Sequence, residues 1–281
     1  DNLRNLLSWC GLTHPAVEPP PPADAFVRFA RSGQRPSSMT FLDCHGHRGD
    51  HACHYHLPNA TLPGIVADMD RLGVTTTCIF SFTGVFSDEQ PGNDLVAEAV
   101  RNHPGRFVGF TLVNPHRGRE AMIAELERGH QMGLRGIKLI PHYQGYPEEG
   151  PLIDVACQWA HDHRQIILNH HWGSPAQMER LVSTYTQACF ITGHATAAYA
   201  AIMAKHPNLF VCSCPLLGPR ACEEMVRTIG ADRLLFGSDL EDLPIAWGLG
   251  PILFAHLSPD DKRRILGGNL ERILETYSQV T

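Results

Sequence analysis

Asp43-Cys44-His45-Gly46-His47 is the segment whose residue types and spacing point most directly to chemistry. It ends an apolar run, and on an extended strand His45 and His47 point to the same side, because side chains alternate with a period of two. Two neutral imidazoles so placed can hold one metal ion. We expect Asp43 to orient the strand or an imidazole rather than to contact the ion.

Three further candidates for a metal or proton-transfer role stand at or just after predicted strands: His170, His194 and Asp239. His170 competes with His171, because alternation lets only one of two adjacent residues face a barrel interior. Asp239 could instead cap a helix or form a turn. His194 could instead be a buried histidine with a satisfied ring, or a helix cap.

From Met39 onward, short apolar runs alternate with longer segments of helical periodicity, such as 121–132 and 152–159. The predicted strands are 41–45, 74–80, 107–113, 136–140, 166–170, 189–192, 209–213 and 234–237. Eight strand–helix units over about 240 residues predict a (β/α)8 TIM barrel. An open doubly wound sheet is the alternative, but no Gly-x-Gly-x-x-Gly follows a strand. In such a barrel, the candidate residues would gather at the C-terminal ends of the strands.

Residues 1–38 differ from the barrel predicted over 39–281. An apolar start over 3–9 leads to Pro19-Pro20-Pro21-Pro22, a stiff spacer, and then to a short amphipathic piece around Phe26 and Phe29. We expect an N-terminal arm that packs on the barrel or on a second subunit, and a homo-oligomer, most simply a dimer.

The composition limits the function classes. The chain of 281 residues carries a formal net charge of -6, which argues against nucleic acid or an anionic membrane as the main partner. No apolar run approaches the roughly 18 residues of a membrane span, and no signal peptide is visible at the start. Nine scattered cysteines favour a reducing, cytoplasmic compartment. We expect a small-molecule substrate.

The motifs together resemble the amidohydrolase superfamily, in the amidohydrolase-2 branch that includes aminocarboxymuconate semialdehyde decarboxylase. The resemblance runs from about Phe41 to Leu274. Besides Asp43-x-His45-x-His47, it rests on Gly136-Ile137-Lys138-Leu139, Gln144-Gly145-Tyr146, His170-His171-Trp172-Gly173, Gly193-His194-Ala195, Pro207-Asn208-Leu209, Phe236-Gly237-Ser238-Asp239 and Gly268-Asn269. Each piece is weak alone, but their order and spacing are specific.

The resemblance implies a role for each matched residue. His45, His47 and His170 would bind one divalent ion, with zinc as the expected metal, and the His-x-Trp spacing favours His170 over His171. Asp239 would be a fourth ligand or the base beside a metal-activated water, and His194 an acid or base near the metal.

Three more residues are candidates for substrate binding. Lys138 could bind a substrate carboxylate, form a salt bridge or, when carbamylated, bridge two metals as in other amidohydrolase branches. Arg48 could hold an anionic substrate or form a surface salt bridge. Trp172 is expected to form a wall of the pocket. The histidines at 51, 54 and 56 could contact substrate, bind metal adventitiously or lie in a solvated loop.

From these residues we expect a hydrolase that cleaves a C–N or C–O bond in a small organic molecule, and we expect this substrate to bear a carboxylate. The alternative is non-oxidative decarboxylation of an unsaturated or aromatic carboxylate, since both chemistries use the same metal and histidines. A hydratase, or a barrel that keeps its metal only for structure or binding, are further alternatives.

Overall fold

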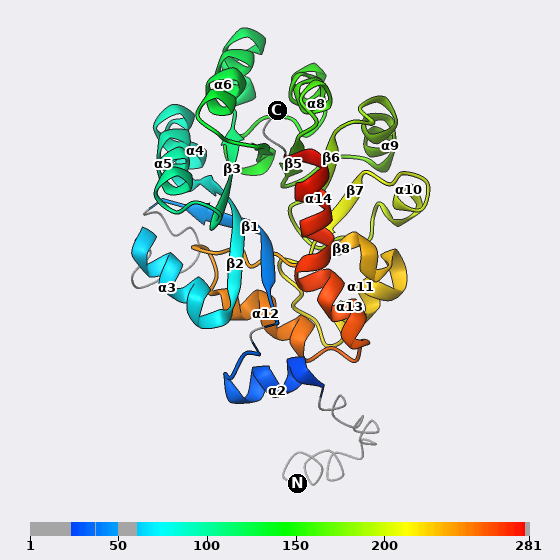
Figure 1. Ribbon diagram of the computed structural model, residues 1–281. Helices are drawn as coiled ribbons and strands as arrows, with labels where there is room; N and C mark the ends of the chain where they lie inside the picture. The colour runs from blue at the N-terminus through cyan, green and yellow to red at the C-terminus, as the bar shows by residue number, and fades with distance from the viewer. Residues whose placement is uncertain (1–23, 37, 50–60, 279–281) are drawn as a thin grey trace, which may run out of the picture.

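Eight parallel strands form one sheet in which each strand pairs with the next along the chain (Figure 1). The computed structural model describes residues 24–36, 38–49 and 61–278. The strands are β1 (Phe41–Arg48), β2 (Val74–Ser81), β3 (Phe107–Leu112), β4 (Gly136–Leu139), β5 (Ile166–Asn169), β6 (Cys189–Thr192), β7 (Leu209–Cys212) and β8 (Leu234–Leu235). All eight predicted strands are therefore confirmed, with ends that differ by up to three residues.

The chain beyond β8 meets β1 and brings the first and last strands together. The Cys44 amide donates to Phe236 O at 2.9 Å, and the His47 amide donates to Leu240 O at 3.0 Å. The Asp239 amide donates in return to His45 O at 2.9 Å. The predicted (β/α)8 barrel is confirmed, and this junction carries the His-x-His segment and Asp239 on adjacent backbones.

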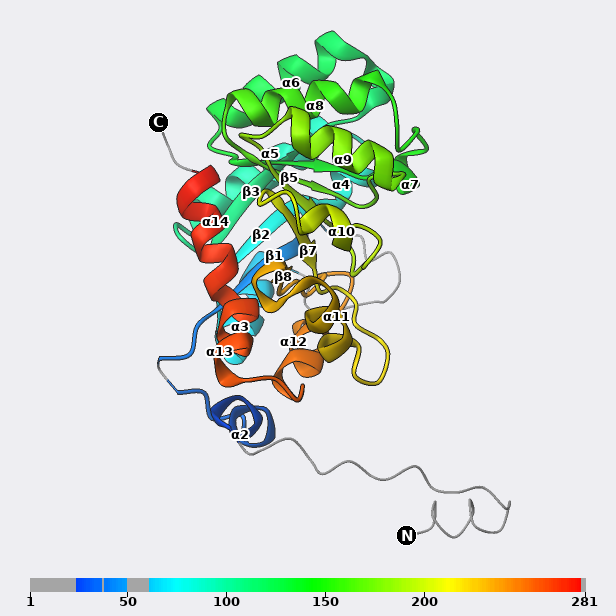
Figure 2. The same ribbon diagram turned by 90° about the vertical axis from the view of Figure 1, so that its right-hand side faces the viewer.

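Helices surround the barrel on its outer side (Figures 1 and 2). The longer ones are α3 (Leu62–Leu72), α5 (Glu89–Asn102), α6 (Arg119–Gln131), α8 (Pro151–Asp162), α9 (Pro175–Thr184), α11 (Ala221–Ile229), α12 (Ile245–Leu253) and α14 (Asn269–Tyr277). Shorter pieces are α4 (Phe82–Phe86), α7 (Pro141–Gln144), α10 (Ala200–Met203), α13 (Pro259–Arg263), the turns η1 (Pro115–Arg117) and η2 (Ala231–Arg233), and the π-helical η3 (Arg264–Gly268). The helices predicted over 121–132 and 152–159 correspond to α6 and α8.

Both faces of the strands are buried, which explains their near-continuous apolar sequences. Inside the barrel, Phe80, Phe110 and Leu168 pack with other inward side chains. On the outer face, Ile137 and Leu139 pack against the helix layer. Alternation along β4 therefore places Lys138, which lies between them, toward the barrel interior.

Helix α2 (Ala25–Ser32) packs against α12 and α13, away from the ends of the strands that carry the histidines (Figures 1 and 2). Phe26 and Phe29 are buried there, and the fully buried Lys262 ammonium lies 2.9 Å from the Asp24 carboxylate. The predicted apolar start over 3–9, the spacer Pro19–Pro22 and the histidines at 51, 54 and 56 lie outside the described residues. None of the helices within the described ranges is long and apolar enough to cross a bilayer.

Candidate metal centre

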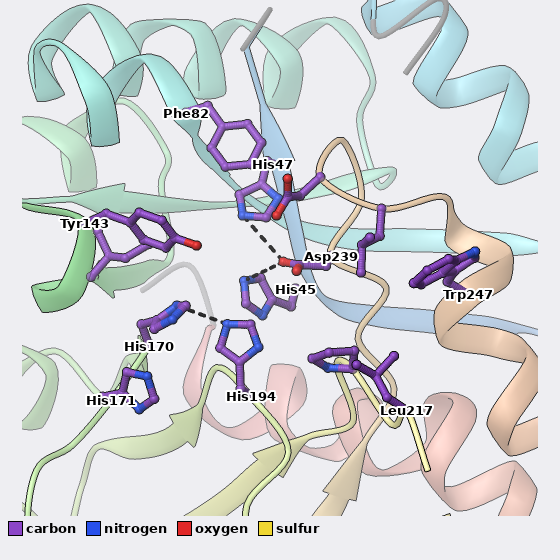
Figure 3. A pocket seen from close by; sticks show the side chains of 14 residues that line it. His45, His47, Phe82, Tyr143, His170, His171, His194, Leu217, Asp239 and Trp247 are labelled. Atoms are coloured by element: carbon purple, nitrogen blue, oxygen red, sulfur yellow. Dashed lines mark hydrogen bonds and ion pairs between the residues drawn. The ribbon is translucent and has the colours of Figure 1, made fainter. Parts of the chain in front are cut away.

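A pocket of about 320 Å³ opens where the strands end, and histidines fill its floor (Figure 3). Its described lining consists of His45, His47, Phe82, Ile140, Tyr143, His170, His171, His194, Pro215, Leu217, Asp239, Asp242, Leu243 and Trp247. The sequence-predicted residues His45, His47, His170, His194 and Asp239 are thus brought together at one rim, although they span almost 200 positions of the chain.

His45 and His47 are oriented by backbone carbonyl groups. His45 Nδ1 lies 2.8 Å from Gly193 O, and His47 Nδ1 lies 2.8 Å from Leu240 O. Since a carbonyl oxygen can only accept, both rings donate through Nδ1–H and keep a lone pair on Nε2. Burial, together with the charge of Lys138, lowers the pKa of both imidazoles well below the ordinary value. Both rings are therefore neutral and available as ligands.

Asp239 faces both free nitrogens. Its Oδ1 lies 3.4 Å from His45 Nε2 and 3.7 Å from His47 Nε2 (Figure 3). The residue has a φ of 60°, in the left-handed region that aspartate tolerates better than most residues. The amides of Asp242 and Leu243 both donate to Asp239 O, at 2.9 and 2.8 Å. This tight turn holds the backbone in a strained conformation that aims the carboxylate at the histidines.

Asp43 supports the centre without lying in the pocket. Its Oδ1 accepts from the amides of His45 and Ser238, both at 3.0 Å, and its Oδ2 accepts from the Ser238 hydroxyl at 2.5 Å. Burial raises the pKa of this carboxyl to about 7 despite these hydrogen bonds. Asp43 therefore fastens the histidine strand to the residue that precedes Asp239, in agreement with its predicted orienting role.

His170 and His194 form a pair on the pocket floor, with His194 next to His45 (Figure 3). His170 Nδ1 lies 3.0 Å from His194 Nε2, and the His194 ring centroid lies 5.7 Å from that of His45 (Figure 3). Burial lowers the pKa of His170, so this ring is neutral. His171 also lines the pocket, but it is exposed. The ligand role of His170 stays a prediction.

The donor set at the junction of β1 and β8 fits a divalent ion. The ligand atoms of His45, His47 and Asp239 all lie within 4.8 Å of one another, and all three residues are buried. Two imidazole nitrogens and a carboxylate oxygen are a ligand set found in catalytic zinc sites, which leave a position open for water or substrate. The backbone acceptors behind both imidazoles are the outer contacts that such ligands need.

The family model for amidohydrolases matches residues 42–276, which is most of the chain. The chain belongs to the amidohydrolase family. Comparison with curated protein sequences gives no significant match. The family assignment agrees with the resemblance inferred from the motifs.

Solved structures share the fold of this chain at low sequence identity. An uncharacterised TIM-barrel protein from Bordetella bronchiseptica aligns with a TM-score of 0.70 and 15% identity, over 86% of this chain and 100% of its own. A 2,6-dihydroxybenzoate decarboxylase from Rhizobium aligns with a TM-score of 0.66 and 14% identity, over 84% of this chain and 99% of its own. A 5-carboxyvanillate decarboxylase from Novosphingobium aromaticivorans was solved in complex with manganese and a nitrobenzoic acid. It aligns with a TM-score of 0.65 and 15% identity, over 85% of this chain and 96% of its own.

Lys138 lies beside the centre but is not among the described residues that line the pocket. Its ammonium is fully buried, has no hydrogen-bond partner among the described residues and sits 4.3 Å from the centroid of the Phe80 ring. Burial lowers the pKa of Lys138 to about 8. The lysine thus contributes positive potential to the histidines, whereas its predicted contact with substrate stays untested.

Arg48 and Trp172 are not among the described residues that line the pocket. Arg48 is the last residue of β1, is half-buried and is absent from the described lining of the pocket. Trp172 was expected to form a pocket wall, but it is completely buried in the core: its Nε1 donates to Ile191 O at 3.1 Å, and its ring packs on Phe190. The indole therefore faces away from the pocket: β5 ends at Asn169, and the irregular segment that follows carries the ring to the helix side.

Cys214, which is not among the sequence-predicted site residues, also lies near the centre. It follows β7 and is buried, and its sulfur lies within 4.8 Å of a carboxylate oxygen of Asp239. Burial raises the pKa of this thiol, and the charge of Asp239 adds to the effect. The available signal was the spacing Cys212-x-Cys214 at the end of a strand, which matches that of His45 and His47.

Proposed function

We propose that the protein is a metal-dependent hydrolase that uses water to cleave a C–N or C–O bond in a small carboxylate-bearing organic molecule. The observation that carries this proposal is the position of Asp239, whose Oδ1 lies 3.4 and 3.7 Å from two imidazole nitrogens that both keep their lone pairs. The Asp239 carboxylate thus completes a set of three donors at the base of a pocket that is large enough for a small molecule.

Zinc is the metal that we propose for this site. Neutral imidazole and carboxylate are among its usual ligands, and an open position at such a site is typical of catalytic zinc. The manganese bound in the decarboxylase from Novosphingobium aromaticivorans is the main competitor. When bound, the ion would acidify a water molecule and polarise the bond to be cleaved.

The side chains around the ion divide the proton transfers between them. Asp239, with its carboxylate next to the ligand nitrogens, would accept the proton that water loses as it attacks. His194, on the pocket floor, would return a proton to the leaving atom, and His170 would hold the His194 ring through the 3.0 Å contact. Since burial keeps His45 and His47 neutral, neither competes with Asp239 for that proton.

Apolar side chains shape the upper part of the pocket. Tyr143 and Trp247 stand on opposite sides of its mouth (Figure 3), and Phe82 stacks on the His47 ring with centroids 3.9 Å apart. Leu217, which is 72% exposed, stands on the rim. Such walls favour a flat or apolar body on the substrate, whose polar end would reach the metal.

Non-oxidative decarboxylation is the second candidate function. Two of the structural neighbours described above are decarboxylases of substituted benzoates, and the aromatic walls of this pocket would accept such a ring. The same residues would serve, with His194 or Asp239 delivering a proton to the carbon that loses carbon dioxide.

The two candidates differ in their products. The metal-loaded protein should be screened against small amides, lactones and aromatic carboxylates, with release of carbon dioxide and production of acid followed in parallel. Acid without carbon dioxide from an amide or lactone supports the hydrolase. Carbon dioxide from a carboxylate would replace it with the decarboxylase.

A further inference from the structure

A second group of metal-ligating side chains shares Asp239 with the first. An imidazole nitrogen of His194, the sulfur of Cys214 and a carboxylate oxygen of Asp239 all lie within 4.8 Å of one another. The Cys214 residue is 1% exposed, so its sulfur is enclosed with the other two ligand atoms. Within the described residues, the pocket floor therefore has two clusters of three ligands that share Asp239.

The backbone holds the second cluster in place. His194 follows β6 and Cys214 follows β7, and the amide of Ala195 donates to Cys214 O at 2.8 Å, which ties the two strand ends together. The Cys214 amide contacts the Cys212 sulfur at 3.4 Å, a further restraint on this turn. Asp239 reaches the pair from the strained turn after β8. The cluster is thus built by three consecutive strands, in the way that barrel sites usually are.

We propose that His194, Cys214 and Asp239 form a second cation position, separate from the position at His45 and His47 and bridged to it by the Asp239 carboxylate. A carboxylate has two oxygens and can therefore contact two ions. Thiolate, imidazole and carboxylate together select zinc or a similarly soft divalent ion over magnesium, calcium or manganese. Binding requires the thiol to lose its proton to solvent.

Occupation of the second position has a consequence for the reaction. An ion bound to the His194 ring occupies a nitrogen that could otherwise take part in proton transfer, and it withdraws negative charge from Asp239. Excess metal should therefore inhibit turnover; this consequence rests on the proposed function, whereas the cation position itself does not.

Stepwise addition of Co²⁺ to metal-free protein under anaerobic conditions tests the proposal directly. We expect two equivalents to bind, and we expect a sulfur-to-cobalt charge-transfer band to grow with one of them. Cys214→Ala should bind one equivalent and show no such band. Cys157→Ala is the matched control, since Cys157 is a buried thiol on α8, far from the pocket, and should keep both features.

Two further variants distinguish loss of the second cation position from loss of the first position and from misfolding. His47→Ala removes a ligand of the first position only. The sulfur-to-cobalt band should therefore persist in this variant, although the affinity of the first position for cobalt falls. Cys214→Ser keeps a hydroxyl for Asp239 and should lose the band as Cys214→Ala does, which guards against misfolding of the alanine variant. Saturation of the wild-type protein at one equivalent without a sulfur band would overturn the second position, and so would a band that survives in both Cys214 variants.

Discussion

The Ser238 hydroxyl donates to Asp43 Oδ2 at 2.5 Å, and the Ser238 amide donates to Asp43 Oδ1 at 3.0 Å, across 195 positions of sequence. This contact joins the strand of His45 and His47 to the residue before Asp239. The spacing between the two imidazoles and the carboxylate therefore depends on a buried carboxyl group that does not itself line the pocket.

Replacement of Asp43 should weaken metal binding without removing a ligand. Asp43→Ala leaves the amides of His45 and Ser238 without their acceptor, and we expect about 10- to 100-fold lower metal affinity and a destabilisation of about 1–3 kcal/mol. Competition with a chelator measures the affinity. Asp43→Asn, whose amide oxygen can still accept from both N–H groups, should stay closer to wild type; equal affinity in wild type and Asp43→Ala would remove the supporting role.

Asp239→Asn should abolish most of the turnover while the fold is retained. The amide cannot accept a proton, and a proton-transfer group contributes about 10²- to 10⁴-fold to rate. Turnover, circular dichroism and metal content should be measured together. Asp242→Asn changes a second carboxylate of the same pocket and should cost much less. An Asp239→Asn variant that keeps most of its activity would leave Asp239 without a catalytic role.

His170 and His194 should differ in their effect on metal binding. If His170 Nδ1 donates to His194, its Nε2 keeps a lone pair, as in His45 and His47. We therefore expect His170→Ala to lower the affinity for the first equivalent of metal by more than about 100-fold, which is more than the loss of an outer hydrogen-bond partner of a ligand causes. His194→Ala should keep this equivalent and lose turnover. Wild-type affinity in His170→Ala would refute the ligand assignment that the motif resemblance implies.

A cluster away from the pocket gives a prediction on stability. Arg180 binds both carboxylate oxygens of Asp154, at 2.7 and 3.1 Å, and the Tyr185 hydroxyl donates to Oδ1 at 2.7 Å. Burial raises the pKa of Asp154, but these hydrogen bonds outweigh it and hold the pKa below the ordinary value. The charged group therefore stabilises the fold above the pKa of the unfolded chain, near 3.8, and this contribution is lost as pH falls through the lower folded-state pKa.

Asp154→Asn should accordingly lower the free energy of unfolding by about 1 kcal/mol at neutral pH, with a difference from wild type that shrinks below about pH 4. Urea unfolding at several pH values measures this. Glu179→Gln, which breaks the exposed ion pair with Lys205, is the control and should change little. If the difference in the free energy of unfolding between wild type and Asp154→Asn grew toward low pH, folding would raise the pKa of Asp154 rather than lower it.

The fold could be predicted from the sequence because its signal is local. Strands buried on both faces produce short apolar runs, and those at 189–192 and 136–140 stand out from the amphipathic helices between them. Because barrel sites lie at the C-terminal ends of strands, it could then be predicted that His45, His194 and Asp239 lie in one pocket. These inferences need only periodicity and order along the chain.

The contacts inside the centre could not be predicted in the same way, because they join side chains far apart in sequence. The Asp43–Ser238 contact, the pairing of His170 with His194 and the approach of Cys214 to Asp239 depend on rotamers and on the path of each turn. The expectation that Trp172 forms a pocket wall is wrong for the same reason: the path of the segment after β5, which ends at Asn169, carries the ring into the core.

The most direct test of the metal centre is anomalous X-ray scattering at the absorption edge of the metal, from crystals loaded with one equivalent. We predict one peak at about 2.0–2.2 Å from Nε2 of His45, Nε2 of His47 and a carboxylate oxygen of Asp239. A peak away from these three atoms, or fully active crystals without any peak, would contradict the proposed centre.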